Sequence, residues 1–120
     1  MQTDFDDQNI MSACNIMHAN GIGSVIIVTR NASETPAGII TERDIVGILG
    51  KLNPDLLQTP LKTLMSKPVI TIEESAGIKD ASKLMNSKNI RRLVVVDKNN
   101  KMIGILTQKD IFNEIGRAHV

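Results

Sequence analysis

GIITERDI (residues 38–45) recurs near the end of the chain as GILTQKDI (residues 104–111). Both stretches carry a glycine, two aliphatic residues, a threonine and, three positions after the threonine, an aspartate. Matches in the same order along two segments indicate a duplicated unit. Outside the two stretches, the aligned pairs are Thr3 and Thr71, Ile10 and Ile78, Ala13 and Ala81, Met17 and Met85, and Ile22 and Ile90.

The composition is typical of a globular domain with an unusual core. The 120 residues are enough to bury a sizeable core. Hydrophobic residues make up 42% and charged residues 22%, but there are only two phenylalanines and no tryptophan or tyrosine, so the core must be aliphatic. A single cysteine, Cys14, excludes an internal disulfide and favours a reducing compartment.

Hydropathy and charge argue against several kinds of partner. No apolar run approaches the roughly 20 residues that a membrane-spanning helix needs. The acidic start MQTDFDDQNI lacks the basic and apolar segments of a signal peptide, so we expect a cytoplasmic protein without membrane contact. A net charge of +1 and the lack of aromatic stacking platforms make nucleic acid an unfavoured partner.

The helices of the first unit are predicted from caps and periodicity. Asp6 or Asp7 is a favourable N-cap for a first helix that ends at Gly21. A second helix runs from about Glu42 and is closed by Gly50. Apolar residues recur at spacings of three and four, which predicts these inward positions: Ile10, Ala13, Cys14, Met17, Ile45, Ile48 and Leu49.

The second unit repeats this plan, and each unit reads β-α-β-β-α. Its first helix carries Ile78, Ala81, Leu84 and Met85, and its last helix begins near Gln108. Runs rich in β-branched residues predict strands at residues 24–29, 37–40, 69–72, 93–96 and 102–106.

A linker and a short helix separate the two units. In this helix, Thr59 is the expected N-cap and Pro60 the first helical residue. The predicted organisation is therefore a first repeat at residues 1–50, a linker with a short helix at 51–66, and a second repeat at 67–120.

GIGSVIIVTRNASETPAGIITERDIV (residues 21–46) and NIRRLVVVDKNNKMIGILTQKDI (residues 89–111) resemble the sequence pattern of CBS domains. These modules are named after cystathionine β-synthase, and the resemblance covers nearly the whole chain. It implies an α/β (α+β) fold in which two β-α-β-β-α repeats pack as a pseudo-two-fold pair.

The Thr-x-x-Asp pattern has a structural and a functional interpretation. At a strand-to-helix junction it is close to a capping box, which needs only these residue types. A helix N-terminus also favours phosphate, and an aspartate one turn in can accept hydrogen bonds from the two hydroxyls of a ribose. Both roles are compatible.

The CBS resemblance implies an adenosine compound as the ligand, namely AMP, ADP, ATP or S-adenosylmethionine, with no required cofactor. The sites would lie in clefts between the two repeats. One would contain Thr41 and Asp44, and the other Thr107 and Asp110. The resemblance also implies ligand contacts from the first strands, at Thr3, Ile70 and Thr71.

Arg91 and Arg92 resemble the basic pair that grips phosphate in nucleotide-binding relatives, where they would serve the site of Asp44. Arginine suits this task because its planar fork donates two hydrogen bonds to phosphate oxygens. The alternative is a solvated basic edge.

Two features depart from the family pattern. Few residues precede Thr3, which removes most of the first strand of repeat 1, so the Asp44 cleft is either open or completed by a partner chain. Glu42 also adds a negative charge where the second repeat has Gln108.

The sequence favours neither a metal site nor an enzyme. Cys14 and His18 lie one helical turn apart, but no further ligand is placed to complete a zinc site, and His119 is in the C-terminal tail. No serine, cysteine or histidine constellation suggests a nucleophile and its base.

We therefore expect a stand-alone regulatory module that senses an adenosine ligand, forms a homodimer and acts on an unidentified regulated protein. The first rival is a ligand-independent assembly module that buries Ile45, Ile48, Ile111 and Phe112 across a two-fold axis. The weaker rival binds nucleic acid through Lys83, Lys88, Arg91 and Arg92.

Overall fold

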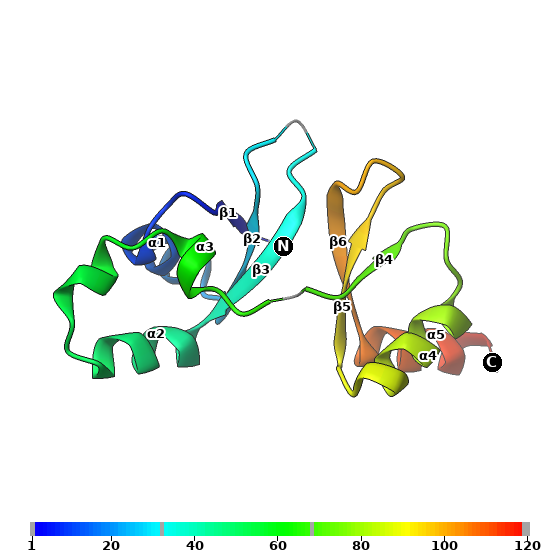
Figure 1. Ribbon diagram of the computed structural model, residues 1–120. Helices are drawn as coiled ribbons and strands as arrows, with labels where there is room; N and C mark the ends of the chain where they lie inside the picture. The colour runs from blue at the N-terminus through cyan, green and yellow to red at the C-terminus, as the bar shows by residue number, and fades with distance from the viewer. Residues whose placement is uncertain (1, 32, 68, 119–120) are drawn as a thin grey trace. The chain divides into compact units, whose positions relative to one another are not determined.

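The structure, a computed structural model, describes residues 2–31, 33–67 and 69–118 and divides into two units, residues 1–69 and 70–120 (Figure 1). The predicted β-α-β-β-α order is found in both units. The elements of the first unit are β1 (Thr3–Phe5), α1 (Ile10–Asn20), β2 (Ser24–Val28), β3 (Pro36–Thr41), α2 (Glu42–Gly50), the 3-10 helix η1 (Pro54–Leu57) and α3 (Leu61–Leu64). Those of the second unit are β4 (Thr71–Glu73), α4 (Ile78–Lys88), β5 (Arg92–Val96), β6 (Met102–Thr107) and α5 (Gln108–Ala118).

Each unit contains a three-stranded sheet with the same pairing. The strand orders are β1-β2-β3 and β4-β5-β6, and in each sheet the first pair is parallel and the second antiparallel. Even an irregularity is repeated, since a register shift falls between Ile27 and Val28 and again between Val95 and Val96. The duplication in the sequence is therefore a duplication of backbone geometry.

The first strand corrects one prediction. We expected the first unit to lack most of this strand, yet β1 and β4 both have three residues. β1 pairs in parallel with β2 through Thr3 and Ile26, as β4 pairs with β5 through Thr71 and Val94. A strand of only three residues can form in each unit because all three pair with the neighbouring strand, β2 in the first unit and β5 in the second.

The ends of α1 follow simple backbone chemistry. The predicted N-caps Asp6 and Asp7 are wrong, because Asn9 is the cap and its side chain accepts a hydrogen bond from the Ser12 backbone N–H. At the other end, Gly21 adopts a left-handed conformation with φ 61°, as predicted for a helix stop.

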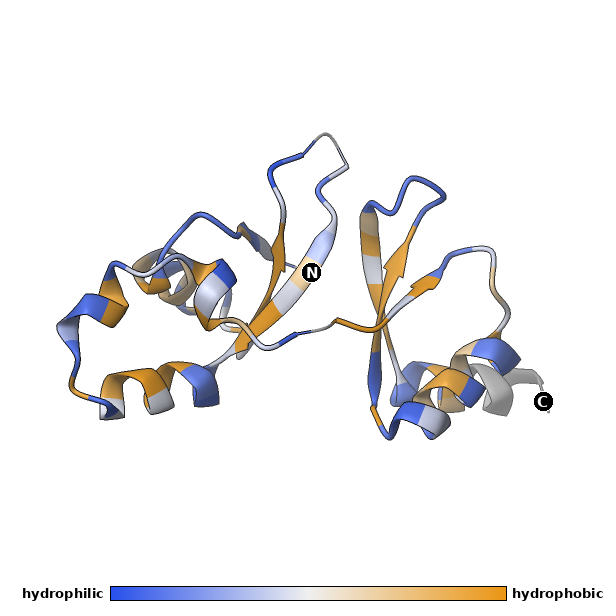
Figure 2. Ribbon diagram, viewed as in Figure 1, coloured by the Kyte–Doolittle hydropathy of each residue, from blue (hydrophilic) through white to orange (hydrophobic). Residues whose placement is uncertain are grey.

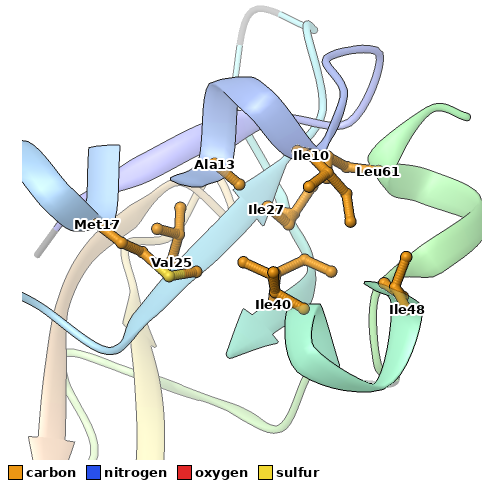
Figure 3. Packing of buried hydrophobic residues seen from close by; sticks show 9 residues of the cluster. Ile10, Ala13, Met17, Val25, Ile27, Ile40, Ile48 and Leu61 are labelled. Atoms are coloured by element: carbon orange, nitrogen blue, oxygen red, sulfur yellow. The ribbon is translucent and has the colours of Figure 1, made fainter. Parts of the chain in front are cut away.

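The core of the first unit lies between its sheet and its helices and is aliphatic, as predicted (Figure 3). One predicted inward residue is wrong, because Leu49 is 54% exposed. The buried members of this core are Ile10, Ala13, Met17, Val25, Ile27, Ile40, Ile45, Ile48 and Leu61.

Figure 2 shows that the loops joining β2 to β3 and β5 to β6 are hydrophilic, in contrast to the strands.

The segment that follows α2 belongs to the first unit. Leu61 is fully buried in its core, and its backbone N–H donates to the Gln8 carbonyl at 2.7 Å. Ser66 exchanges two backbone hydrogen bonds with Ile39 of β3, at 2.9 and 3.1 Å. Pro60, not Thr59, is the N-cap of α3; the Thr59 hydroxyl instead donates to the Asp55 carbonyl.

Among the side chains that the structure describes, the core of the second unit uses the same positions as that of the first. Its buried members are Ala81, Met85, Leu93 and Ile111, with Leu84 packed against them. Among the helices of the described residues, none combines the length and the apolar character that crossing a membrane would require.

Candidate functional site

Thr41 and Asp44 form a reciprocal cap at the junction of β3 and α2. The Asp44 backbone N–H donates to Thr41 Oγ1 at 3.2 Å, and the Thr41 backbone N–H donates to Asp44 Oδ2 at 2.9 Å. Thr41 keeps the extended backbone of the strand, with φ −115° and ψ 165°, while its side chain serves the helix. The capping interpretation of Thr-x-x-Asp is thus confirmed for the first unit.

Thr107 and Asp110 repeat this cap at the junction of β6 and α5. The Asp110 N–H donates to Thr107 Oγ1 at 3.1 Å, and the Thr107 N–H donates to Asp110 Oδ2 at 2.9 Å. Hydrogen bonds from the backbone and side chain of Thr107, together with the charge of Lys109, lower the pKa of Asp110. The carboxylate is therefore held in its ionised form.

Each cap leaves half of a carboxylate available. Only Oδ2 of Asp44 and Oδ2 of Asp110 are engaged, and over the described residues neither Oδ1 atom accepts a hydrogen bond. The oxygen already engaged fixes the orientation of the other. Each junction thus presents an oriented anionic acceptor beside a helix N-terminus, which suits a ligand that donates hydroxyl hydrogens.

The second unit brings Thr71, Arg92 and Thr107 to one face of its sheet. Arg92 lies opposite Thr107 in the β5–β6 pair, and Thr71 lies beside Val94, two positions from Arg92. Since side chains alternate along a strand and match across it, these three predicted residues share a face. It is the face opposite the core residue Leu93.

Arg91 and Ile70 do not join this set. Arg91 precedes β5 and lines a surface cavity of about 470 Å³ with Asn86 of α4 and Gln108 of α5. Ile70 packs against the core cluster. The two arginines therefore lie on different sides of the sheet. That both bind the phosphate of a ligand at the site of Asp44 stays a prediction.

The first unit has the corresponding face with different chemistry. Ser24 lies opposite Thr41, where the second unit has Arg92 opposite Thr107. Thr3 pairs with Ile26, as Thr71 pairs with Val94. We did not predict Ser24 as a site residue, although the alignment of the repeats places it on Arg92. Its hydroxyl gives the first unit a neutral group where the second has a cation.

The first unit also has a cavity between α1 and α2, of about 630 Å³, to which Cys14, His18 and Glu42 contribute. Glu42 points here rather than toward the strand face, since its side chain lies against Gly23. Burial raises the pKa of the Cys14 thiol, so this thiol is not an activated nucleophile. Within residues 2–31, 33–67 and 69–118 no three His, Cys, Asp or Glu side chains gather as a metal site; His119 lies outside these residues.

The repeated fold and the repeated caps define a duplicated α/β module, and sequence comparison gives its family. The profile of the CBS domain matches residues 5–51 and 61–117, so the chain belongs to the CBS domain family and the predicted tandem is confirmed.

Several curated proteins are similar in sequence to this chain. Uncharacterized protein MK0525 of Methanopyrus kandleri is 51% identical over 98 residues, which are 79% of this chain and 47% of that protein. The chain thus spans less than half of that relative. CBS domain-containing protein YhcV of Bacillus subtilis is 31% identical over 88% of this chain and 71% of its own length. Inosine-5'-monophosphate dehydrogenase of Methanocaldococcus jannaschii is 31% identical over 88% of this chain, which is 20% of the enzyme.

Known structures of CBS proteins have the same fold. The CBS domain pair of protein MJ0100, solved with 5'-methylthioadenosine and S-adenosyl-L-methionine, is 27% identical, with a TM-score of 0.70 over 98% of this chain and 89% of that chain. CBS domain protein PAE2072 from Pyrobaculum aerophilum, complexed with AMP, is 24% identical, with a TM-score of 0.74 over 97% of this chain and 91% of that chain. The second likeness concerns the fold alone.

Proposed function

We propose that this chain is a regulatory module that binds an adenosine compound, either an adenine nucleotide or S-adenosylmethionine. The observation that carries the proposal is the duplicated cap, which orients one unengaged carboxylate oxygen on Asp44 and one on Asp110. The ligands named for relatives of this family contain a ribose, whose neighbouring hydroxyls are donors for such an oxygen. Regulation would follow if the ligand favours one state of the protein over another.

The proposed roles follow from the chemistry of each position. Asp44 and Asp110 accept from the ribose hydroxyls of their ligands, and Thr41 and Thr107 hold these carboxylates in place. In the second unit, Arg92 and Thr71 lie on the same face as Thr107 and provide a cation and a hydroxyl to a phosphate.

The test separates the capping role from the ligand role. Asp44→Asn and Asp110→Asn keep one carbonyl oxygen for the threonine N–H but replace the unengaged anionic oxygen with an amide. We expect each to weaken adenosine binding at its own site about tenfold or more, since hydrogen bonds to a charged group contribute about 1.5–3 kcal/mol. Thr41→Ser is the control, because it retains the hydroxyl.

Isothermal titration of AMP, ADP, ATP and S-adenosylmethionine against these variants gives the readout. A ligand at 100 times its Kd should stabilise the wild-type protein by about 2.7 kcal/mol in a thermal-shift assay. Unchanged affinity in both asparagine variants would remove the ribose role. Absence of stabilisation by all four compounds would end the proposal.

Arg92 distinguishes the two ligand classes. A nucleotide presents a phosphate group, whereas S-adenosylmethionine carries one carboxylate together with a cationic sulfonium and an ammonium group, so the guanidinium favours the nucleotide more strongly. Arg92→Gln should therefore weaken the binding of AMP, ADP and ATP more than that of S-adenosylmethionine. The reverse order of effects would assign the site to the sulfonium compound.

We also propose a homodimer as the assembled form, on a surface that differs in part from the one predicted. Three of the four predicted interface residues, Ile45, Ile48 and Ile111, are buried in the cores of their own units, whereas Phe112 is 76% exposed and stays available to a partner. Val46 and Leu49, one turn apart on α2, are 69% and 54% exposed and offer an apolar face to a second copy. Sedimentation analysis of Val46→Glu should show monomers where the wild-type chain forms dimers; a wild-type monomer at all concentrations would refute this assembly.

A further inference from the structure

Each unit has a cavity at the same place, between the two helices of its β-α-β-β-α repeat. The cavity of the first unit lies between α1 and α2, and that of the second between α4 and α5, which lie side by side (Figure 1). The same left-handed turn ends the first helix of each pair, at Gly21 (φ 61°) and at Asn89 (φ 54°). The apolar floors are also aligned, and consist of Met17, Ile22 and Ile45 in the first unit and Met85, Ile90 and Ile111 in the second.

The rims of the two cavities differ in charge. In the described part of the first unit, the rim carries Cys14, His18 and Glu42, and neither lysine nor arginine lines the cavity. In the second unit the aligned positions are neutral and polar, and two cations, Lys83 and Arg91, are added. Among the residues that the structure describes, no aspartate or glutamate lines this second cavity. The neutral polar members of its rim are Ser82, Asn86, Asn89 and Gln108.

The fold uses the backbone of this rim but not its polar side chains. The Gln108 N–H donates to the Arg91 carbonyl at 2.8 Å, which joins the two sides of the cavity, and the Asn89 N–H donates to the Asn86 carbonyl at 3.3 Å. Among the side chains that the structure describes, by contrast, neither Lys83 nor Arg91 forms an ion pair, and no polar side chain of the rim forms a hydrogen bond. Two cations and several amide groups on a fixed frame are therefore available to a ligand.

The charge and the size of the second cavity indicate the class of ligand. Its two cations attract an anion, and the N-terminus of α5 adds to this field because Gln108 is the first residue of that helix. Arginine and lysine both bind phosphate, while amides and hydroxyls exchange hydrogen bonds with hydroxyl groups. A volume of about 470 Å³ lies in the range of small-molecule sites, about 300–1,000 Å³. A sugar phosphate combines these chemical groups.

We propose that the cavity between α4 and α5 binds a sugar phosphate or a similar small phosphorylated molecule. Lys83 and Arg91 hold the phosphate, and the amides of the rim bind the hydroxyl groups beside it. This site is separate from the proposed adenosine site, because Arg92 and Thr107 lie on the sheet face opposite the core, whereas this cavity lies over the core residue Ile111. The acidic rim of the first cavity repels phosphate, so the first unit has no such site.

The probes are ribose 5-phosphate and inorganic phosphate, each titrated into the isotopically labelled full chain and followed by NMR. We expect saturable shifts at the amides of Lys83, Asn89 and Arg91 and none at those of His18 and Glu42 in the aligned cavity. Ribose is the matched control ligand and should produce no saturable shifts over the same concentrations, because it lacks the phosphate. Absence of saturable shifts with both phosphate probes would overturn the proposal.

The two neighbouring arginines provide a matched pair of variants. Arg91→Gln removes one of the two cationic contacts and should weaken the binding of ribose 5-phosphate about tenfold. Arg92→Gln, on the other side of the sheet, should leave this affinity unchanged. Equal weakening by both variants, or weakening by Arg92→Gln alone, would place the phosphate at the adenosine site and overturn the proposal.

Gln108→Glu gives the second cavity the charge of the first. In the first unit, Cδ of Glu42 lies 3.4 Å from the position of a Cβ built on Gly23, so the carboxylate that Gln108→Glu adds would lie beside Arg91. The added charge suits the first turn of α5, as Glu42 suits that of α2, so the fold should be retained. We expect loss of ribose 5-phosphate binding, and an unchanged affinity would contradict the proposal.

A single-stranded oligonucleotide is the last probe, because its backbone also presents phosphate. We expect it to bind no more tightly per phosphate than ribose 5-phosphate. Much tighter binding that shifts the same amides and weakens steeply with salt would overturn the proposal in favour of nucleic acid as the occupant.

Discussion

A matched pair of alanine substitutions tests the difference between the two sheets. In Gly38→Ala, the added methyl group overlaps Met65 and lies 2.9 Å from the Ser66 carbonyl oxygen, so both must move. Overpacking costs about 1–3 kcal/mol, and weakening of the Ile39–Ser66 hydrogen bonds costs about 1 kcal/mol more, which predicts a loss of about 2–4 kcal/mol. In Gly104→Ala, the methyl group meets nothing within 4 Å. Alanine in place of a strand glycine should then stabilise the second unit by about 0.5–1 kcal/mol.

The two units need separate readouts, because a protein of two units need not unfold in one step. Urea unfolding followed by NMR gives these through the amide of Ile40 for the first unit and that of Leu106 for the second. We expect a lower midpoint for Ile40 in Gly38→Ala and a higher midpoint for Leu106 in Gly104→Ala. Equal losses in the two variants would refute the reasoning that Gly38 is in close contact with Met65 and Ser66 while Gly104 has open space beside it.

Three further variants test single contacts. Asn9→Ala removes the side-chain acceptor that caps α1 at 3.3 Å, so the free energy of unfolding of the first unit should fall by about 1 kcal/mol in urea titration. The lowered pKa of Asp110 means that its contribution to the stability of the second unit is present above pH 3.8, the ordinary aspartate value, and is lost as the pH falls through the lower folded value. Asp110→Asn should therefore flatten the acid limb of a plot of urea midpoint against pH; an unchanged limb would contradict the assignment. Arg30 forms an ion pair with Asp7 at 2.6 Å and lies 4.1 Å from the centre of the Phe5 ring. Because the side chains of the ion pair are about half exposed and the Phe5 ring is half-buried, Arg30→Ala should cost no more than about 1 kcal/mol by thermal denaturation, and a larger loss would show a structural role that these contacts do not explain.

The fold was predictable wherever local chemistry decides it. The aligned repeats predicted both sheets, and Gly21 predicted the end of α1 because its left-handed backbone favours glycine. The cap of α1 was less predictable, since Asn9, Asp6 and Asp7 are all suitable residues and the exact start of the helix selects among them. The burial of Leu61 in the core of the first unit was not predictable, because it depends on tertiary packing and not on local sequence.

The candidate site was predictable to a similar extent. The spacing of Thr41 and Asp44 correctly predicted a reciprocal cap, because the capping geometry is local. The separation of Arg91 from Arg92 depends on where β5 begins, and a change of one residue sends a side chain to the other face of the sheet. Composition and spacing therefore could not predict which of the two neighbouring arginines lies on the same face of the sheet as Thr107.

Because α3 is built into the first core, the two halves of this chain are mechanically unequal. If the chain is pulled from its ends, the first unit should release residues 1–69 and the second residues 70–120, which correspond to extended lengths of roughly 240 and 180 Å at about 3.5 Å per residue. A force trace should then show two steps of different size. Two equal steps would mean that the residues after α2 separate from the first core before it unfolds and do not contribute to its step.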